Sequence, residues 1–215
     1  MKFDDRYRSI FKTDLIEGAM LAGEFGFPVI HRTHSRPNRL ISFDKAISCR
    51  DYSQWVHFYI PDPLFERIWR SPWNYLGMLS KYDGVISPDF SIPICHPQFV
   101  QLESVAKSRV IGSWLQRSGI DVIPNVRWGR PESYRFAFDS IEPGGTVAIG
   151  TLGCTKNPVL REVFREGLPE LVRRIEPSLI VVYGAIHEPT LSPVFEAGIE
   201  IVHFNCQTSI VKEAS

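Results

Sequence analysis

From residue 55 onward, short segments rich in valine and isoleucine alternate with longer amphipathic segments, and this alternation limits the possible folds more than any other feature. Between the valine- and isoleucine-rich segments, apolar residues recur at helical spacing, and helices are predicted from about Gln98 to Arg117 and from about Pro158 to Ile175. Alternating strands and helices predict a parallel sheet covered by helices, and β-branched strands are typical of sheets buried on both faces. The six predicted strands of this part are Trp55–Ile60, Gly84–Ser87, Asp121–Val126, Thr146–Gly150, Ser178–Tyr183 and Ile199–Phe204.

A single α/β domain is expected over residues 1–215, because this length is typical of one domain. Residues 1–26 have apolar positions at helical spacing and are predicted to form an N-terminal helical extension, which leaves residues 27–205 as the α/β core. Further predicted strands, near Val29 and over Leu40–Ile47, would raise the number of strands to the eight of a TIM barrel. No helix separates these first strands, so an open doubly wound sheet is the alternative. A barrel or partial barrel is slightly favoured.

The overall charge is balanced, with 24 basic and 24 acidic residues. This balance argues against a protein that binds nucleic acid or membranes through its net charge. No apolar run approaches the roughly 20 residues that span a bilayer, and the first residues lack the apolar core of a signal peptide. The four cysteines are far apart and form no Cys-x-x-Cys pair. We therefore expect a cytoplasmic protein with reduced thiols and no membrane partner.

Polar side chains follow the ends of several predicted strands. In parallel α/β folds, binding sites gather at the carboxyl ends of the strands. The residues found there are Asp62, Asp89, Asn125, Arg127, Thr151 and Tyr183. Because side chains alternate along a strand, Asn125 and Arg127 should point to one side and Trp128 to the other. A polar pocket that contains Asp89 and Arg127 is one interpretation. The others are that polar residues merely mark wet loops, that the acids cap helices, or that Asp89 and Arg127 form a structural ion pair.

If the pocket is real, an enzyme and a simple ligand-binding protein are both possible. Asp89 is then the candidate general base or metal-facing carboxylate, Arg127 the anion-binding group, and Asn125 and Tyr183 the groups that orient the ligand. A phosphorylated or nucleotide-like small molecule is the expected ligand, since guanidinium groups suit phosphate oxygens. Further candidate ligand-binding residues are Asp62, Ser91, Arg109, Trp128, Thr151 and Gly153.

Known cofactor and catalytic motifs are missing from the sequence. It contains no Gly-x-Gly-x-x-Gly turn, no Walker-type phosphate loop, no His-Glu-x-x-His and no Gly-x-Ser-x-Gly, so the sequence leaves any cofactor unknown, and no metal site is predicted. The loop from Thr151 to Asn157 could hold an anion on its backbone amides, although an ordinary strand-to-helix turn is the favoured interpretation. If Arg109 faces the interior, it needs a carboxylate partner such as Asp89 or Asp83.

The segment His31–Arg39 suggests a different function. It contains Arg32, Arg36 and Arg39, two histidines and no acidic residue. Arginines in such a loop can contact the phosphates of a nucleic acid, in which case the protein is a non-catalytic factor that binds nucleic acid or a host protein. A solvated loop whose charge is balanced by acids elsewhere is the simpler interpretation.

Several motifs in fixed order resemble a known family. They are YDGVISPDFS (82–91), SRVIGSWLQRSGI (108–120), DVIPNVRWG (121–129), VAIGTLGC (147–154) and IVVYG (180–184). Together they are similar to an uncharacterised bacterial and phage family that is described only as a domain of unknown function. The resemblance covers about residues 40–185. It implies a phage or mobile-element setting and a cytoplasmic location, and it implies no particular activity.

Overall fold

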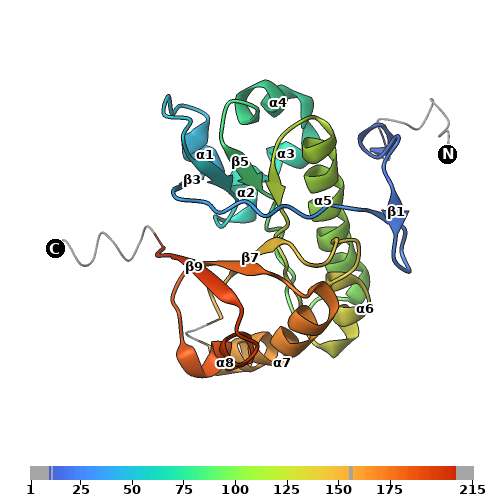
Figure 1. Cartoon of the computed structure of the whole chain (residues 1–215). Coiled ribbons are helices and arrows are strands. Elements are labelled where there is room, and N and C mark those ends of the chain that lie inside the picture. Colours follow the sequence, from blue (N-terminus) through green and yellow to red (C-terminus); the bar gives the residue numbers. More distant parts are fainter. Residues whose placement is uncertain (1–9, 11, 155–156, 207–215) are drawn as a thin grey trace.

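The computed structural model describes residue 10, residues 12–154 and residues 157–206 (Figure 1). Parallel strands in chain order form a four-stranded and a three-stranded sheet. The first contains β3 (Leu40–Ser42), β4 (Trp55–His57), β5 (Gly84–Ile86) and β6 (Val122–Ile123), and the second contains β7 (Thr146–Gly150), β8 (Leu179–Tyr183) and β9 (Glu200–Phe204). An isolated parallel bridge between Asn125 and Ala148 connects β6 to β7. The predicted α/β class with a mainly parallel sheet is confirmed.

The two sheets curve around a shared apolar interior. Side chains from β4, β5, β6, β7 and β8 meet in one buried cluster, and the ring of Tyr59 stacks on that of Tyr183 with 4.9 Å between centroids. Each strand pairs with its neighbours in the sequence, which is the order of a barrel and differs from the reversed order of a doubly wound sheet. Among residues 12–154 and 157–206, no backbone pairing connects β9 to β3.

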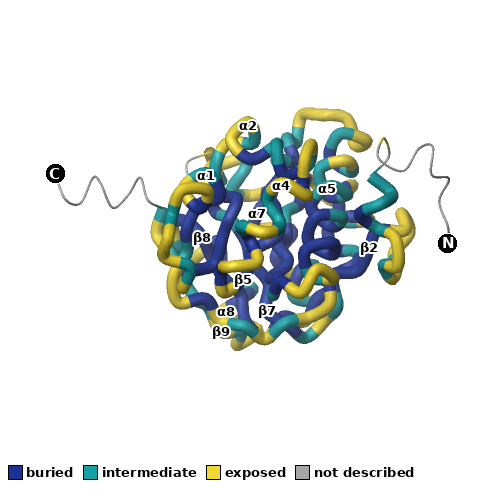
Figure 2. The backbone as a smooth tube through the Cα atoms, turned by 90° about the horizontal axis from the view of Figure 1, so that it is seen from above, coloured by how far each residue is buried: buried dark blue, intermediate teal, exposed yellow. Residues whose placement is uncertain are grey.

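Helices cover the outer faces of both sheets. The longest are α5 (Gln98–Arg117) and α7 (Pro158–Ile175), and both have the bounds that the sequence predicts. The shorter helices are α1 (Phe43–Ala46), α2 (Asp62–Phe65), α3 (Arg67–Arg70), α4 (Trp73–Leu79), α6 (Tyr134–Ala137), α8 (Glu188–Glu196) and the 3-10 turn η2 (Pro131–Ser133). α5 packs beside the first sheet, whereas α7 and α8 pack on the second (Figure 1). Viewed from above, buried strands and helix faces lie inside a rim of exposed loops (Figure 2).

The N-terminal segment differs from the predicted helical extension over residues 1–26. Its described part contains a 3-10 turn, η1 (Thr13–Leu15), followed by β1 (Leu21–Ala22), which pairs antiparallel with β2 (Phe27–Pro28). Gly23 and Gly26 have positive φ angles, which a right-handed helix does not allow. Residues 1–9 and 11 lie outside the described residues.

The predicted strand Leu40–Ile47 is also shorter than expected. β3 ends at Ser42, and α1 begins at the next residue, Phe43. Phe43 and Ala46 are both fully buried, and their spacing of three residues fits one helical turn. An apolar run this short does not distinguish a strand from a buried helical turn by its pattern alone.

The basic segment His31–Arg39 crosses the molecule at the amino ends of the strands (Figure 1). The carbonyl oxygen of Thr33 accepts a hydrogen bond from Thr146 N at 2.7 Å, and that of Arg39 accepts one from Trp55 N at 2.9 Å. Thr146 and Trp55 are the first residues of β7 and β4. Because parallel strands have all their carboxyl ends at one edge, this segment lies at the opposite edge from the predicted site.

Candidate functional site

Three of the predicted site residues meet at the carboxyl ends of β5 and β6. Asp89 is 8% exposed, and its Oδ1 accepts a hydrogen bond from Asn125 Nδ2 at 2.9 Å. Its Oδ2 accepts from Arg127 Nη1 at 2.5 Å, which forms an ion pair. Asn125 and Arg127 are two residues apart after β6, so that both reach the same carboxylate, as the alternation of side chains along an extended chain requires. The structure therefore brings Asp89, Asn125 and Arg127 into contact at the expected edge of the sheet, and their role in binding stays a prediction.

Tyr59 extends this cluster, and sequence reasoning did not select it. The Tyr59 hydroxyl donates a hydrogen bond to Asn125 Oδ1 at 2.9 Å. Its ring stacks on Tyr183, a predicted site residue, at an interplanar angle of 12°. In the sequence Tyr59 lies in an apolar run and resembles a core residue. The available indication was its position two residues after the end of β4, where a side chain returns to the same face as His57.

His57 belongs to the same aromatic group but not to the pocket described below. Its ring lies 4.4 Å from that of Tyr183, and its Nδ1 accepts a hydrogen bond from Tyr59 N at 3.1 Å. Burial lowers the pKa of His57 to about 3. The imidazole is therefore neutral at physiological pH and contributes packing without charge.

The buried position of the cluster controls its electrostatics. Burial raises the pKa of Asp89 above the usual 3.8, while the charge of Arg127 and the hydrogen bonds from Arg127 and Asn125 oppose this rise. The negative charge of Asp89 in turn raises the pKa of Arg127. Burial also raises the pKa of Tyr59 well above 10, so its hydroxyl remains protonated and able to donate.

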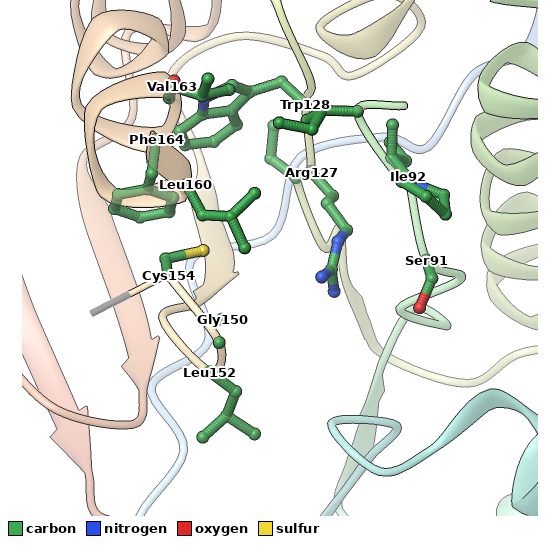
Figure 3. Close-up of a pocket in the computed structure, with 14 residues that line it drawn as sticks. Ser91, Ile92, Arg127, Trp128, Gly150, Leu152, Cys154, Leu160, Val163 and Phe164 are labelled. Atoms are coloured by element: carbon green, nitrogen blue, oxygen red, sulfur yellow. The ribbon is translucent and has the colours of Figure 1, made fainter. Parts of the chain in front are cut away.

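A cavity of about 250 Å³ lies beside the ion pair, between the loop after β5, the loop after β7 and the start of α7. Figure 3 shows the Arg127 guanidinium between Ser91 and Ile92 on one side and Cys154 and Leu160 on the other. The remaining wall is largely apolar, since Trp128 stacks on Phe164 with 5.0 Å between ring centroids. The Arg127 side chain is 33% exposed, much more than its buried partner Asp89. Among the described lining residues, the arrangement is an apolar pocket with one cationic group, Arg127.

Two further predicted residues, Asp62 and Ser91, hold one wall of this pocket in place. Asp62 Oδ1 accepts a hydrogen bond from the Ser91 hydroxyl at 2.8 Å, and its Oδ2 accepts from Ser91 N at 3.0 Å. The carbonyl of Ser91 accepts from the Ser104 hydroxyl on α5 at 2.8 Å. Asp62 therefore ties the loop that follows β5 to the start of α2, and both of its oxygens are already engaged.

The loop after β7 forms the opposite wall. Thr151 is buried, and its hydroxyl donates to the carbonyl of Ala185 at 2.9 Å, which links this loop to the one after β8. Gly153 lines the pocket and has a φ of 80°, a conformation that favours glycine. Burial raises the pKa of the Cys154 thiol, which also lines the pocket, so the thiol is protonated and a poor nucleophile.

Arg109 occupies the interior behind this site. It is 1% exposed and donates to three backbone carbonyls: Nε to Asp139 at 3.0 Å, Nη1 to Asn125 at 3.2 Å and Nη2 to Ala137 at 2.7 Å. The expected partnership with Asp89 or Asp83 is therefore not what holds this guanidinium; backbone oxygens do. Burial lowers the pKa of Arg109 to about 10, which still leaves it charged at neutral pH.

Each arginine of the basic segment is paired with a carboxylate at the amino edge of the sheets. Arg32 pairs with Glu142 at 3.2 Å, Arg39 with Asp51 at 2.8 Å, and Arg36 with Glu200. All three side chains are more than half exposed. The basic segment and the pocket are thus two separate regions of the molecule.

Two other structural findings concern the described residues only. No group of three or more His, Cys, Asp or Glu side chains in this part of the chain is arranged to hold a metal ion. None of the helices in it combines the length and the apolar character needed to cross a membrane.

Comparison with known proteins places the chain in a family. The model of DUF4417, described as a domain of unknown function, matches residues 19–204, and the chain belongs to this family. Over 131 residues, or 61% of the chain, it is 39% identical to "Gene 1 protein" of Mycobacterium phage L5 and 36% identical to "Gene 1 protein" of Mycobacterium phage D29. These matches cover 57% and 48% of the two phage proteins, so the chain matches about half of each relative's length. No solved structure matches the chain significantly. The resemblance to an uncharacterised phage family is confirmed.

Proposed function

We propose that the pocket beside Asp89 and Arg127 binds a small anionic molecule of the phosphorylated or nucleotide-like class. The observation that supports this most directly is that the Arg127 guanidinium lies at the cavity and uses only part of its N–H donors in its contact with Asp89. Within the described residues it has a hydrogen-bonded partner at Nη1, in Asp89, and the rest of the group lies at an otherwise apolar cavity. A guanidinium has five N–H donors, so donors remain for a ligand.

The size and lining of the cavity narrow the ligand class. About 250 Å³ is slightly below the roughly 300–1,000 Å³ of most ligand pockets, which favours a small molecule. Ile92, Trp128, Leu160 and Phe164 suit a planar or apolar body, while Arg127 suits one phosphate or carboxylate. Away from water, charge-assisted hydrogen bonds of this kind are stronger than at an exposed surface.

In this proposal Asp89 fixes Arg127, Asn125 fixes Asp89, and Tyr183 supports the cluster through its stacking on Tyr59. Binding is favoured over catalysis because both carboxylate oxygens of Asp89 already accept hydrogen bonds. An activity in which Asp89 serves as general base requires that a ligand reach a remaining lone pair of this buried carboxylate. The phage relatives support a role in a phage or mobile-element cycle, and we infer a cytoplasmic location from that setting.

Nucleic-acid binding through Arg32, Arg36 and Arg39 is the alternative. Its support is that these three side chains lie more than half exposed on one short segment. The pairing of each with a carboxylate lowers the local positive charge, so this function ranks second.

A thermal-shift screen tests the two functions together. Inorganic phosphate, adenosine monophosphate, ribose 5-phosphate and a short single-stranded oligonucleotide are added to the wild type, to Arg127→Gln and to Arg32→Gln as a matched charge control. A ligand at one hundred times its Kd stabilises the fold by about 2.7 kcal/mol, a measurable rise in Tm. We expect a rise with at least one phosphorylated small molecule that disappears in Arg127→Gln and persists in Arg32→Gln.

Two results would contradict pocket binding. If a ligand raises the Tm of Arg127→Gln as much as that of the wild type, the ligand binds elsewhere. The alternative is favoured if only the oligonucleotide raises the Tm and this rise falls steeply with salt. The rise should then be lost in the triple variant Arg32→Gln, Arg36→Gln, Arg39→Gln.

A further inference from the structure

The hydrogen bonds from Tyr59 to Arg127 form a chain with a fixed direction. An ionised carboxylate only accepts hydrogen bonds, so the amide group of Asn125 that faces Asp89 must be its Nδ2, the donor. The amide oxygen then faces Tyr59, and the Tyr59 hydroxyl must donate to it. Asp89 Oδ2 is left for Arg127. Each member of the chain thus determines the orientation of the next.

The backbone of Asn125 is held independently of this chain. Its N–H donates to the Ser87 hydroxyl at 2.8 Å, and its carbonyl accepts from Arg109 at 3.2 Å. The neighbouring backbone pairs with Ala148 of β7 through Val126 N at 2.8 Å. The backbone contacts do not fix the orientation of the Asn125 side-chain amide. Tyr59 and Asp89 are the groups that determine it.

The Tyr59 ring is itself firmly placed. Tyr183 of β8 stacks on it, and Gly150 of β7 lies so close that an added Cβ would be 2.8 Å from two ring atoms. Both neighbours come from the second sheet, whereas Tyr59, Asp89 and Asn125 follow strands of the first. The hydroxyl is thus held at the point where the two sheets meet.

From this geometry we infer that Tyr59 is a positioning residue of the pocket, acting through Asn125 and Asp89 on the direction in which Arg127 presents its N–H groups. This inference rests on the proposed function. It also narrows the class of ligand: a guanidinium carries only N–H donors, so Arg127, once its position is fixed by Asp89, presents only donors to the cavity. The pocket then selects a group with several acceptor oxygens, a deprotonated phosphate or carboxylate, over a neutral amide or alcohol.

Tyr59→Phe tests the inference because it removes the hydroxyl and keeps the stacked ring. Tyr82→Phe is the matched control, since Tyr82 is also buried and its hydroxyl donates one hydrogen bond, to the Ala46 carbonyl at 2.8 Å. The first readout needs no ligand. The titration of the Asp89 carboxyl is followed by NMR, together with the Nε–H resonance of Arg127.

In Tyr59→Phe the Asn125 amide oxygen is no longer held by the Tyr59 hydroxyl, so when Asp89 is protonated the amide can rotate and accept a hydrogen bond from the carboxyl O–H, which stabilises the protonated form. We expect the pKa of Asp89 to rise above its wild-type value and the Arg127 resonance to move, whereas Tyr82→Phe leaves both unchanged. If Tyr59→Phe leaves both unchanged and merely loses as much stability as Tyr82→Phe, Tyr59 is a structural residue and the inference is overturned.

A double-mutant cycle gives a second, independent test by urea unfolding. An asparagine at position 89 can face either end of the Asn125 amide, so Tyr59→Phe should cost less stability in an Asp89→Asn background than in the wild type. An equal cost in both backgrounds would overturn the inference.

The affinity for whichever phosphorylated probe raises the wild-type Tm is measured last. We expect a loss of about tenfold in Tyr59→Phe, the size that one hydrogen bond supports. If no probe binds the wild type but the ligand-free readouts change as described, the proposed function fails while the positioning role stands.

Discussion

Two arginines contact the same small cluster, and the regions around them differ in how completely their N–H groups are used. Arg109 donates directly to the Asn125 carbonyl and to two more carbonyls, with 1% of its surface exposed. Arg127 reaches Asn125 through Asp89 and is one-third exposed at an apolar cavity. A buried guanidinium held by three backbone oxygens supports the fold, whereas one held by a single carboxylate at a cavity has N–H groups available to a ligand.

Replacing Arg109 should give the largest effect. Arg109→Met leaves three buried or nearly buried carbonyls without their donor, each at a cost of about 1–3 kcal/mol. We expect a loss of roughly 3 kcal/mol or more in the free energy of unfolding, measured with urea. The double variant Arg127→Met, Asp89→Asn is the control, because it removes the guanidinium without leaving a buried carboxylate unpaired, and it should lose clearly less. Equal losses in the two variants would remove the distinction between the two regions.

The ion pair should make stability depend on pH in a way that Arg127 controls. The folded-state pKa of Asp89 is raised above 3.8 by burial. Between 3.8 and that folded pKa the native state binds more protons than the unfolded state, so stability falls as pH rises through this window. Arg127→Ala removes the positive charge that opposes this rise. The folded-state pKa of Asp89 is then higher still, and stability falls with pH over a wider range.

The corresponding measurement is urea unfolding of Arg127→Ala between about pH 5 and pH 8. The double variant Arg127→Ala, Asp89→Asn is the control, because it shares every other titrating group. We expect the single variant to lose more stability with rising pH than the double variant. Parallel pH profiles would mean that Asp89 is not the titrating group.

The loop that follows β5 should depend on Asp62. Asp62→Ala leaves the hydroxyl and N–H of Ser91 without their acceptor, and each such hydrogen bond contributes about 1 kcal/mol. We expect a loss of roughly 1–2 kcal/mol and faster amide hydrogen exchange over residues 90–94 (the pocket wall). Asp51→Ala, an exposed acid paired with Arg39, is the control and should leave this exchange unchanged.

The smallest effect is expected in the basic segment. Replacing Arg32, Arg36 and Arg39 by glutamine removes ion pairs that are more than half exposed, and such pairs contribute about 0–1 kcal/mol. Urea unfolding should therefore change little, and ligand binding in the pocket not at all. A large destabilisation would assign these arginines a structural role at the amino edge.

The fold class was predictable because buried parallel strands and amphipathic helices leave strong periodic patterns, and α5 and α7 even have the predicted bounds. The proximity of Asp89, Asn125 and Arg127 was predictable, because the carboxyl ends of parallel strands lie at one edge of the sheet. Tyr59 was not, because an apolar run does not show which hydroxyl finds a partner on another strand. The backbone partners of Arg109 were not predictable either, because every residue has a carbonyl and the sequence does not show which of them a side chain contacts.

The most direct test of this distinction is the arginine Nε–H region of the NMR spectrum of isotopically labelled protein, recorded with increasing adenosine monophosphate and, separately, inorganic phosphate. The resonance of Arg127, assigned by its absence in Arg127→Gln, should move and saturate with at least one of the two, while that of Arg109 stays in place. Movement of neither resonance with either probe, or equal movement of both, would contradict the assignment of Arg127 as the ligand-facing group.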